Sequence, residues 1–232
     1  MKKVQYEEML PHELAAAIKQ WPVAYVPVGS HEWHGRHLPL GNDTLKAHAI
    51  CVRAARRHGG VVVPGTYWGH MGHWKPGCHP GIAPELADRL FTDVFKGLVV
   101  VGFKVVIGVT GHDVGQQVAS LQKAVDAISA DGKAAGFAMM EGSLNADDAE
   151  VGMDHAAKWE TSYMMAFRPE LVEMDRIARE DLVSEAGRKE AGIGGLDPRE
   201  HASAEVGEKA IARMVDAIGR KAKELLAGLA KG

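Results

Sequence analysis

Short apolar runs recur along the chain and are separated by longer stretches with helical periodicity. Four of these runs predict strands, at residues 23–28, 61–63, 104–109 and 134–140. The first run, Val-Ala-Tyr-Val-Pro-Val, has no charged position. Near-continuous apolar strands of this kind are typical of a parallel sheet that is covered on both faces.

The stretches between and after these runs predict helices. Their expected ranges are 43–58, from Pro84 to about 98, 115–130, about 155–167 and about 203–229. Proline is favoured in a first helical turn, which supports a helix start at Pro84. The residues of that helix expected to face the core are Leu86, Leu90, Val94 and Leu98. A glycine-rich loop is expected at 191–197.

Strands that alternate with helices pair in parallel through right-handed crossovers. We therefore predict an α/β fold, a three-layer α/β/α sandwich with a mostly parallel central sheet. A chain of 232 residues suffices for one such core, so residues 1–232 are expected to form a single domain.

Composition narrows the classes of partner. The chain has 46% hydrophobic and 25% charged residues and a net charge of −3, without a long Lys/Arg stripe, so no nucleic-acid partner is expected. No apolar run approaches the roughly 20 residues of a membrane span, and the N-terminus lacks the apolar core of a signal peptide. We expect a cytoplasmic protein with reduced thiols. Cys51 is expected in the core. Cys78 is expected either to be an inert thiol or to line a site.

Candidate chemistry gathers directly after the first strand, in the stretch G-S-H-E-W-H-G-R-H-L-P-L-G-N-D of residues 29–43. Glu32 and His34 are two positions apart and project to the same side of an extended segment. Asp43 follows a Pro-Leu-Gly-Asn turn and could bridge two metals with its two oxygens, or only cap the next helix. Carboxylates and imidazoles together are ligands for zinc, manganese or iron(II), although a solvated polar loop would also use them.

Two further segments can reach the same place. His112 follows the third strand, and the carboxyl ends of parallel strands meet at one edge of a sheet, where ligands bind. His155 and Glu160 are five positions apart, which puts them about 140° apart on a regular helix. They can share a site only if His155 precedes that helix.

The loop at 66–83 is rich in His and Trp, with His70, His73, His79, Trp68 and Trp74. This loop is expected either to form a wall or lid at the substrate site, or to have no role in function. His31 and His37 flank the candidate ligands and could orient them from behind.

These segments together resemble the creatininase family of metal-dependent amidohydrolases. Residues 29–44 are similar to its signature G-S-x-E-x-H-G-x-H-L-P-x-x-x-D-T, and residues 110–112 to its N-G-H. Residues 154–162 resemble H-A-G-x-x-E-T-S, and residues 194–207 resemble G-D-P-x-x-A-x-x-x-x-G. The resemblance extends over nearly the whole chain.

The resemblance implies a dinuclear site that holds two divalent ions, with Zn²⁺ expected first and Mn²⁺ or Fe²⁺ as alternatives. By position, the metal ligands would be Glu32, His34, Asp43, His112 and Glu160, with Asp43 as the bridge. His155 matches the family's catalytic histidine and would act together with Glu160. The reaction implied is hydrolysis of a carbon–nitrogen bond in a small cyclic or linear amide by a metal-activated water. Relatives commonly form hexamers, so a homo-oligomer is expected on this ground alone.

One departure from the family pattern affects the expected substrate. Creatininase carries a metal-binding glutamate two residues after the histidine of N-G-H, where this chain has Val114. This argues against creatinine itself and leaves Glu160 or Asp113 to complete the second metal. Lactone hydrolysis, deformylation or isomerisation at the same metals, and a non-catalytic metal-binding subunit, remain as alternatives.

Overall fold

Four parallel strands form one sheet in the order β2-β1-β3-β4. The computed structural model describes residues 3–72, 79–178, 180–182 and 184–231. The strands are β1 (Val23–Val28), β2 (Val61–Val62), β3 (Val105–Thr110) and β4 (Ala135–Met140). β1 pairs with β3 along its whole length, from Val23 opposite Val105 to Val28 opposite Thr110. The predicted parallel sheet is confirmed, within one residue at each strand end.

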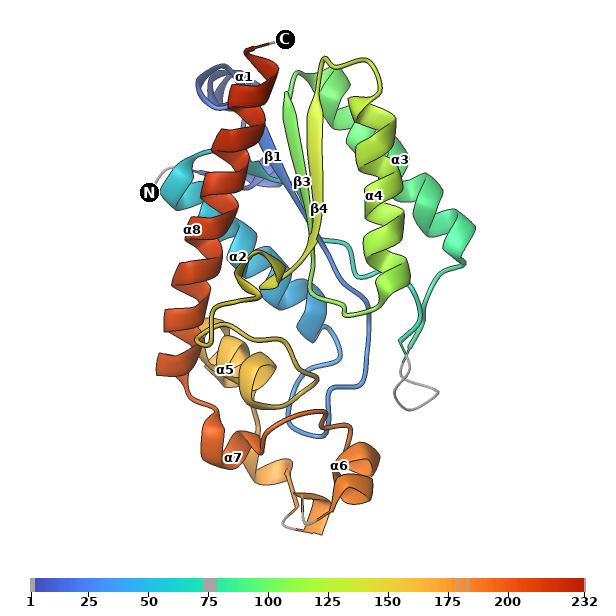
Figure 1. The fold of residues 1–232 in the computed structure, drawn as a ribbon, viewed down its shortest axis with the longest axis vertical. Helices are drawn as coiled ribbons and strands as arrows, with labels where there is room; N and C mark the ends of the chain where they lie inside the picture. Colours follow the sequence, from blue (N-terminus) through green and yellow to red (C-terminus); the bar gives the residue numbers. More distant parts are fainter. Residues whose placement is uncertain (1–2, 73–78, 179, 183, 232) are drawn as a thin grey trace.

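Helices cover both faces of the sheet, which confirms the three-layer prediction (Figure 1). One face is covered by α2 (Asn42–His58) and α8 (Ala204–Leu229), and the other by α3 (Pro84–Val101) and α4 (Gly115–Ser129). A further helix, α1 (Pro11–Gln20), packs Leu14 and Ile18 against the α3 side. Among the described residues, no helix combines the length and the apolar character that crossing a membrane requires.

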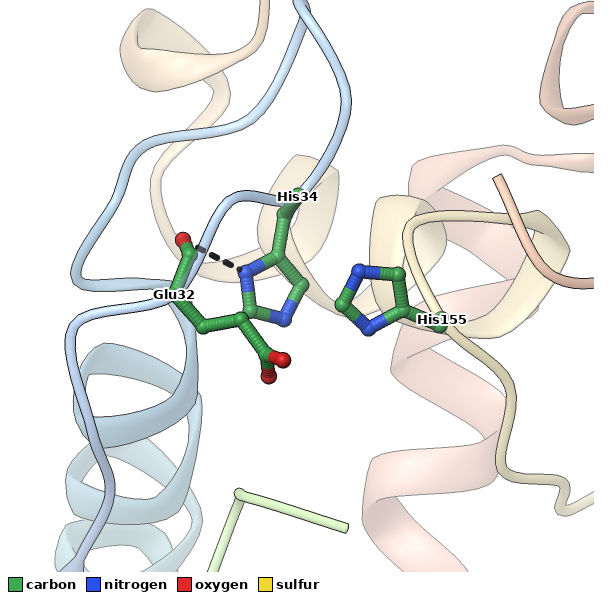
Figure 2. A group of neighbouring side chains, drawn as sticks. All are labelled: Glu32, His34 and His155. Atoms are coloured by element: carbon green, nitrogen blue, oxygen red, sulfur yellow. Dashed lines mark hydrogen bonds between the residues drawn. The ribbon is translucent and has the colours of Figure 1, made fainter. Parts of the chain in front are cut away.

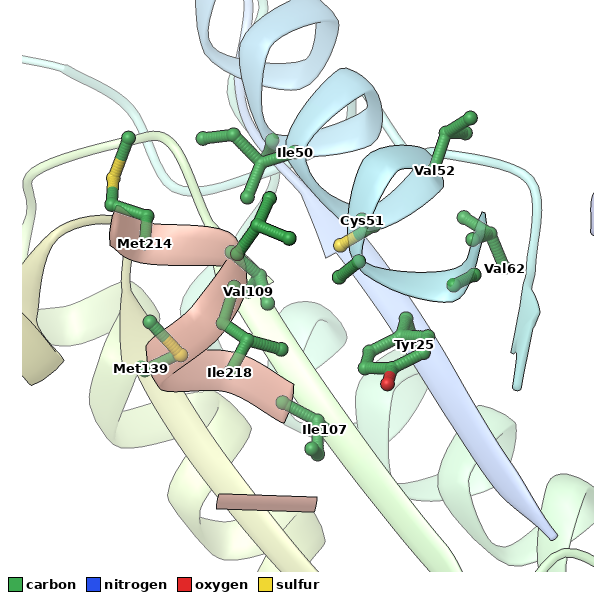
Figure 3. Packing of buried hydrophobic residues seen from close by; sticks show 14 of the residues in the cluster. Tyr25, Ile50, Cys51, Val52, Val62, Ile107, Val109, Met139, Met214 and Ile218 are labelled. Atoms are coloured by element: carbon green, nitrogen blue, oxygen red, sulfur yellow. The ribbon is translucent and has the colours of Figure 1, made fainter. Parts of the chain in front are cut away.

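The two layers of the core follow from the alternation of side chains along the central strands. Tyr25 on β1 and Ile107 and Val109 on β3 pack toward α2 and α8, as Figure 3 shows. Their neighbours Ala24 and Val106 face α3 and α4 instead. Successive residues of a strand point to opposite faces, so an uncharged strand supplies two hydrophobic layers at once.

Beyond the carboxyl ends of the strands lies a third group of short elements (Figure 1). It contains α5 (Lys158–Phe167), α6 (Glu185–Ala191) and α7 (Pro198–His201). Short 3₁₀ turns occur at Tyr6–Glu8, Ser143–Asn145, Pro169–Leu171, Met174–Arg176 and Glu180–Leu182. The sequence pattern does not predict α1, α6, α7 or these turns, because none of them carries a long apolar stripe.

The predicted inward face of α3 is confirmed at Leu98 and at Leu90, which packs against the core, but is wrong at Leu86 and Val94. Its buried residues are Ala87, Phe91, Phe95 and Leu98, whereas Leu86 and Val94 are exposed. Two apolar stripes overlap on this helix, and the two are not equal in size. Burying two phenylalanines removes more apolar area from water than burying Leu86 and Val94, so the helix turns the phenylalanine stripe inward.

This correction gives a stability prediction. Leu86→Ala is expected to change the free energy of unfolding by less than about 0.5 kcal/mol, because the side chain is 55% exposed. The same change at Leu98, on the buried face, should cost about 2 kcal/mol. Urea unfolding of the two variants measures the difference. Equal losses would place Leu86 in the core and contradict the observed face.

Candidate metal centre

The six residues singled out in the sequence come together at the carboxyl edge of the sheet. Glu32 and His34 lie in the loop after β1, and Asp43 lies in the first turn of α2. His112 follows β3 directly, while His155 and Glu160 come from the segment around α5. The five candidate ligands Glu32, His34, Asp43, His112 and Glu160 are all buried.

Two groups of three donor atoms consist of these five residues alone and share Asp43, while a third group joins Glu32 and His34 to His155. One group is Glu32, Asp43 and His112, and the other is His34, Asp43 and Glu160; within each, the donor atoms lie within 4.8 Å of one another. The two oxygens of Asp43 divide between them. Oδ2 lies 3.0 Å from His112 Nδ1, and Oδ1 lies 2.9 Å from His34 Nε2. The Asp43 side chain therefore lies between two potential cation sites.

The short contacts at Asp43 do not have the geometry of hydrogen bonds. Neither carboxylate oxygen of Asp43 and neither ring nitrogen of His112 has a hydrogen-bond partner, although all four atoms are buried. His112 Nδ1 lies 2.9 Å from Glu32 Oε2 and 3.0 Å from Asp43 Oδ2, so this nitrogen faces both carboxylates. Ligands of one ion, with bonds of about 2.1 Å, lie roughly 3.0–3.4 Å apart. The donor set thus fits divalent cations.

The electrostatics of the site also favour a cation. Burial lowers the pKa of His112, but the adjacent carboxylates of Asp43 and Glu32 overcome this and raise it to about 9. Burial raises the pKa of Asp43, yet His34 and His112 hold it well below its ordinary range. A potential that retains a proton on a buried imidazole also attracts a metal ion to the same donors.

Backbone carbonyls fix the tautomers of two imidazoles. His34 Nδ1 donates to the Glu32 carbonyl at 3.1 Å, which leaves Nε2 as the ligand atom. His155 Nε2 donates to the Trp33 carbonyl at 2.9 Å, because a carbonyl only accepts. The His34 and His155 rings stack with centroids 4.4 Å apart, and the Glu32 carboxylate points to the space beside them (Figure 2).

His155 can join the site because it precedes α5, which begins three residues later than predicted. Its backbone pairs with Gly194 through two hydrogen bonds of 3.2 and 2.7 Å. The next residue, Ala156, has a φ of +50°, a conformation that favours glycine. This turn lets the Ala156 N–H donate to Glu160 Oε2 at 2.7 Å, so the strained residue orients a candidate ligand.

Two charged groups at the site, the half-buried Asp154 and the buried Lys46, were not predicted from the sequence. Asp154 accepts from the backbone N–H groups of Trp159 and Glu160, at 2.8 and 3.2 Å, and so caps the start of α5. Burial raises the pKa of Asp154 to about 6. Lys46, on α2, lies against Glu141 and Glu160 and is almost fully buried. In the sequence, the nearby apolar residues Ala47, Ile50 and Cys51 were the signal that this part of the helix is buried.

A pocket of about 270 Å³ opens onto four of the five candidate ligands, all except His112. Its described lining residues are Glu32, His34, Asp43, Asp113, Val114, Asp154, His155, Glu160 and Gly194. Asp113 is exposed at this pocket and belongs to none of the donor groups formed by the described residues, whereas Glu160 belongs to one. The geometry therefore favours Glu160 over Asp113 for the second cation site.

The other histidines near the candidate site differ in their contacts. His37 Nε2 lies 3.0 Å from Thr161 Oγ1, beside Glu160, as expected of a residue that supports a ligand. His31 instead stacks on Tyr67, with ring centroids 5.3 Å apart. His70 is buried, with Nε2 2.9 Å from Ser120 Oγ, and does not line the pocket. His73, Trp74 and Cys78 lie outside the described residues.

Gln117 of α4 ties together the loops that carry the candidate ligands. Its amide nitrogen donates to the Gly29 carbonyl at 3.3 Å and to Thr110 Oγ1 at 3.1 Å. Its oxygen accepts from His70 N at 2.8 Å. Thr110 Oγ1 in turn accepts from His112 N at 3.0 Å, so Gln117 supports the loop that presents His112.

We expect Gln117→Ala to lower the free energy of unfolding by about 2 kcal/mol, because it leaves buried polar groups at three places without their partner. Gln116→Ala is the matched control, since Gln116 is exposed on the same helix turn. Thermal and urea unfolding measure both variants. A loss at Gln117 no larger than that at Gln116 would contradict the supporting role.

Comparison with known proteins gives matches along most of the sequence. A family model described as creatininase (creatinine amidohydrolase) matches residues 7–221. A mycofactocin precursor peptide peptidase of Mycobacterium ulcerans is 29% identical over 180 residues, which cover 68% of this chain and 63% of that protein. A creatinine amidohydrolase of Pseudomonas putida is 27% identical over 184 residues, 67% and 68% of the two chains. The match thus spans less than two thirds of the mycobacterial relative.

Solved structures share the fold over almost the whole length. A crystal structure of creatinine amidohydrolase (creatininase) superposes with a TM-score of 0.80 at 22% identity and covers 97% of this chain and 99% of its own. A structure described as creatininase Mn has a TM-score of 0.78 at 24% identity, with 96% and 98% covered. At this identity the likeness establishes the architecture alone.

Proposed function

The chain belongs to the creatininase family, and from that premise we propose that it hydrolyses a carbon–nitrogen bond in a small cyclic or linear amide at a dinuclear metal centre. The observation that carries this proposal is the placement of Asp43 between two donor groups, with one oxygen directed to each. A site for one metal would not require the two oxygens of Asp43 to face different donor groups.

Each cation site is proposed to have three protein ligands. Glu32, Asp43 and His112 would hold one ion, and His34, Asp43 and Glu160 the other. Relatives are described as a creatininase mutant of Zn-Zn type and as creatininase Mn, which supports zinc or manganese in this chain, with iron(II) as a further possibility. When bound, two divalent ions lower the pKa of a water and polarise the carbonyl of a substrate.

His155 is proposed to move the proton. Burial lowers the pKa of its ring, so the neutral form, with its hydrogen on Nε2 and the Trp33 carbonyl as acceptor, prevails at neutral pH. The lone pair on Nδ1 can then accept a proton and pass it to the leaving nitrogen. The stacked His34 ring and the Gly194 backbone hold His155 in place for this exchange.

The described lining of the pocket supports a substrate other than creatinine. Val114 lines the pocket at the position where creatininase has a metal-binding glutamate, so the polar contacts available to a substrate differ there. One relative is named as a peptidase, so peptide amides belong among the candidates. We further propose a single domain over residues 1–232, a cytoplasmic location, a small-molecule substrate and, by family resemblance, a hexameric homo-oligomer.

The test is the metal content of the purified protein, followed by a substrate screen. Elemental mass spectrometry before any added metal or chelator should find about two equivalents of zinc, manganese or iron. The loaded protein is then assayed against cyclic amides, linear amides, formamides, peptide amides and lactones. Turnover of lactones alone would replace the amide assignment. Failure to retain or take up any metal would overturn the proposal.

A further inference from the structure

The side chain of Lys46 is buried within contact of the candidate metal centre. It is 2% exposed, and its ammonium contacts Oε1 of Glu160 and Oε1 of Glu141. Glu141, just after β4, is equally enclosed. Burial raises the pKa of Glu141 to about 8, so the lasting ion pair is that of Lys46 with Glu160. Removing such a pair from water costs several kcal/mol per ion and is offset only when its geometry is good. A hydrophobic residue at this helix position would avoid that cost.

The contacts of Glu160 show what the lysine does. Oε1 is engaged by Lys46, while Oε2 accepts from Ala156 N at 2.7 Å and faces His34 Nε2 at 3.3 Å. The two oxygens are therefore assigned to different partners. With Oε1 held on the protein side, Oε2 alone is presented to the cation site that also contains His34 and Asp43.

The cation site formed by His34, Asp43 and Glu160 depends on Glu160 for its second carboxylate. Position 114 has an apolar side chain in this chain, and Asp113 is outside the donor groups of the described residues. Glu160 is thus the carboxylate that completes the set with His34 and Asp43. A glutamate has three side-chain torsions, and any one that turns Oε2 away removes a third of the protein ligands.

We propose that Lys46, held by Glu141, is a positioning residue that fixes Glu160 as a one-oxygen ligand of the second cation site. The inference rests on the proposed function, because it requires that this site binds a metal. Lys46 does not touch the reacting atoms. It acts through Glu160, as outer partners orient the ligands of other metal sites.

The experiment compares four proteins: wild type, Lys46→Met, Lys46→Met with Glu141→Gln, and Lys209→Met. The single change at Lys46 leaves two buried carboxylates without a cation, so it can fail to fold. The double variant replaces one of those carboxylates with a neutral amide of the same shape. Lys209 is paired with Glu205 at 2.8 Å on the exposed side of α8 and is the matched control. Competition with a fluorescent chelator gives the affinity for each Zn²⁺ equivalent, and thermal unfolding of the metal-free proteins gives stability.

We expect the double variant to unfold as wild type does, to keep its affinity for the first Zn²⁺ and to bind the second at least about tenfold more weakly. Lys209→Met should match wild type in both. Wild-type affinity for the second equivalent in the double variant would show that Lys46 only stabilises the fold. Tighter binding would show that its charge competes with the metal. Either result overturns this inference alone, whereas absence of Zn²⁺ uptake by wild type overturns the proposed function as well.

Discussion

The Asp43→Asn variant is expected to lose both metal equivalents and to hydrolyse substrate at least about 10³-fold more slowly, which corresponds to ~4 kcal/mol of transition-state stabilisation. Asp43 belongs to both donor groups proposed to bind a cation, Glu32-Asp43-His112 and His34-Asp43-Glu160, so a single change affects both sites. Asparagine keeps the shape of the side chain but offers one neutral oxygen in place of two charged ones. The fold should persist, because neither oxygen of the Asp43 carboxylate has a hydrogen-bond partner, on α2 or elsewhere among the described residues.

Elemental mass spectrometry and circular dichroism test this result together. Asp113→Asn is the control, since it removes a carboxylate from the same pocket but from outside the donor groups of the described residues. That variant should keep two equivalents. If Asp43→Asn retained one equivalent with unchanged affinity, the shared-ligand arrangement would be wrong.

Gly111→Ala is expected to lower the free energy of unfolding by about 3 kcal/mol and to impair metal retention. A Cβ at this position would lie 2.2 Å from the backbone oxygen of Asp43 and 2.9 Å from its carbonyl carbon. Backbone atoms cannot move aside as a flexible side chain does. The loop that carries His112 and the first turn of α2 would therefore separate, and the ligands on them with it.

The chain offers a control for this glycine four residues further on. A Cβ on Gly115, the first residue of α4, meets no atom within 4 Å. Gly115→Ala should be neutral or stabilise by up to about 1 kcal/mol, because alanine restricts the unfolded chain. Urea unfolding and metal analysis of both variants separate the steric effect at Gly111 from the general effect of replacing a glycine. Equal behaviour of the two would contradict close approach of Gly111 to α2.

The parallel sheet could be predicted because its strands carry the signal by themselves. The apolar runs at β1 and β3 are uninterrupted, and alternation with helices implies the crossovers. The inward face of α3 could not be predicted in the same way. Its two overlapping stripes are both apolar, and the choice between them depends on the size of the space beneath Phe91 and Phe95, which is a tertiary property.

The candidate site was predictable as a set of residues, but its arrangement was not. The spacing of Glu32, His34 and Asp43 and the position of His112 after a strand indicated shared ligands; their assignment to two metals stays a prediction. The contribution of His155 depended on a backbone turn at Ala156, a residue type that rarely adopts a positive φ. Lys46 had a helical pattern around it and would ordinarily be placed at the surface, since buried lysines are rare.

The order of the elements has a consequence for how the protein is made. β1 and β3 pair side by side, but the helix that completes the cover over their α2 side, α8, comes last in the chain. At about 5–20 residues per second, synthesis reaches α8 several seconds after β3 has emerged. During this interval Ile107 and Val109 lack their final cover, so the nascent chain is at its most aggregation-prone between the third strand and the last helix. We expect truncations just before Ala204 to depend on chaperones for solubility.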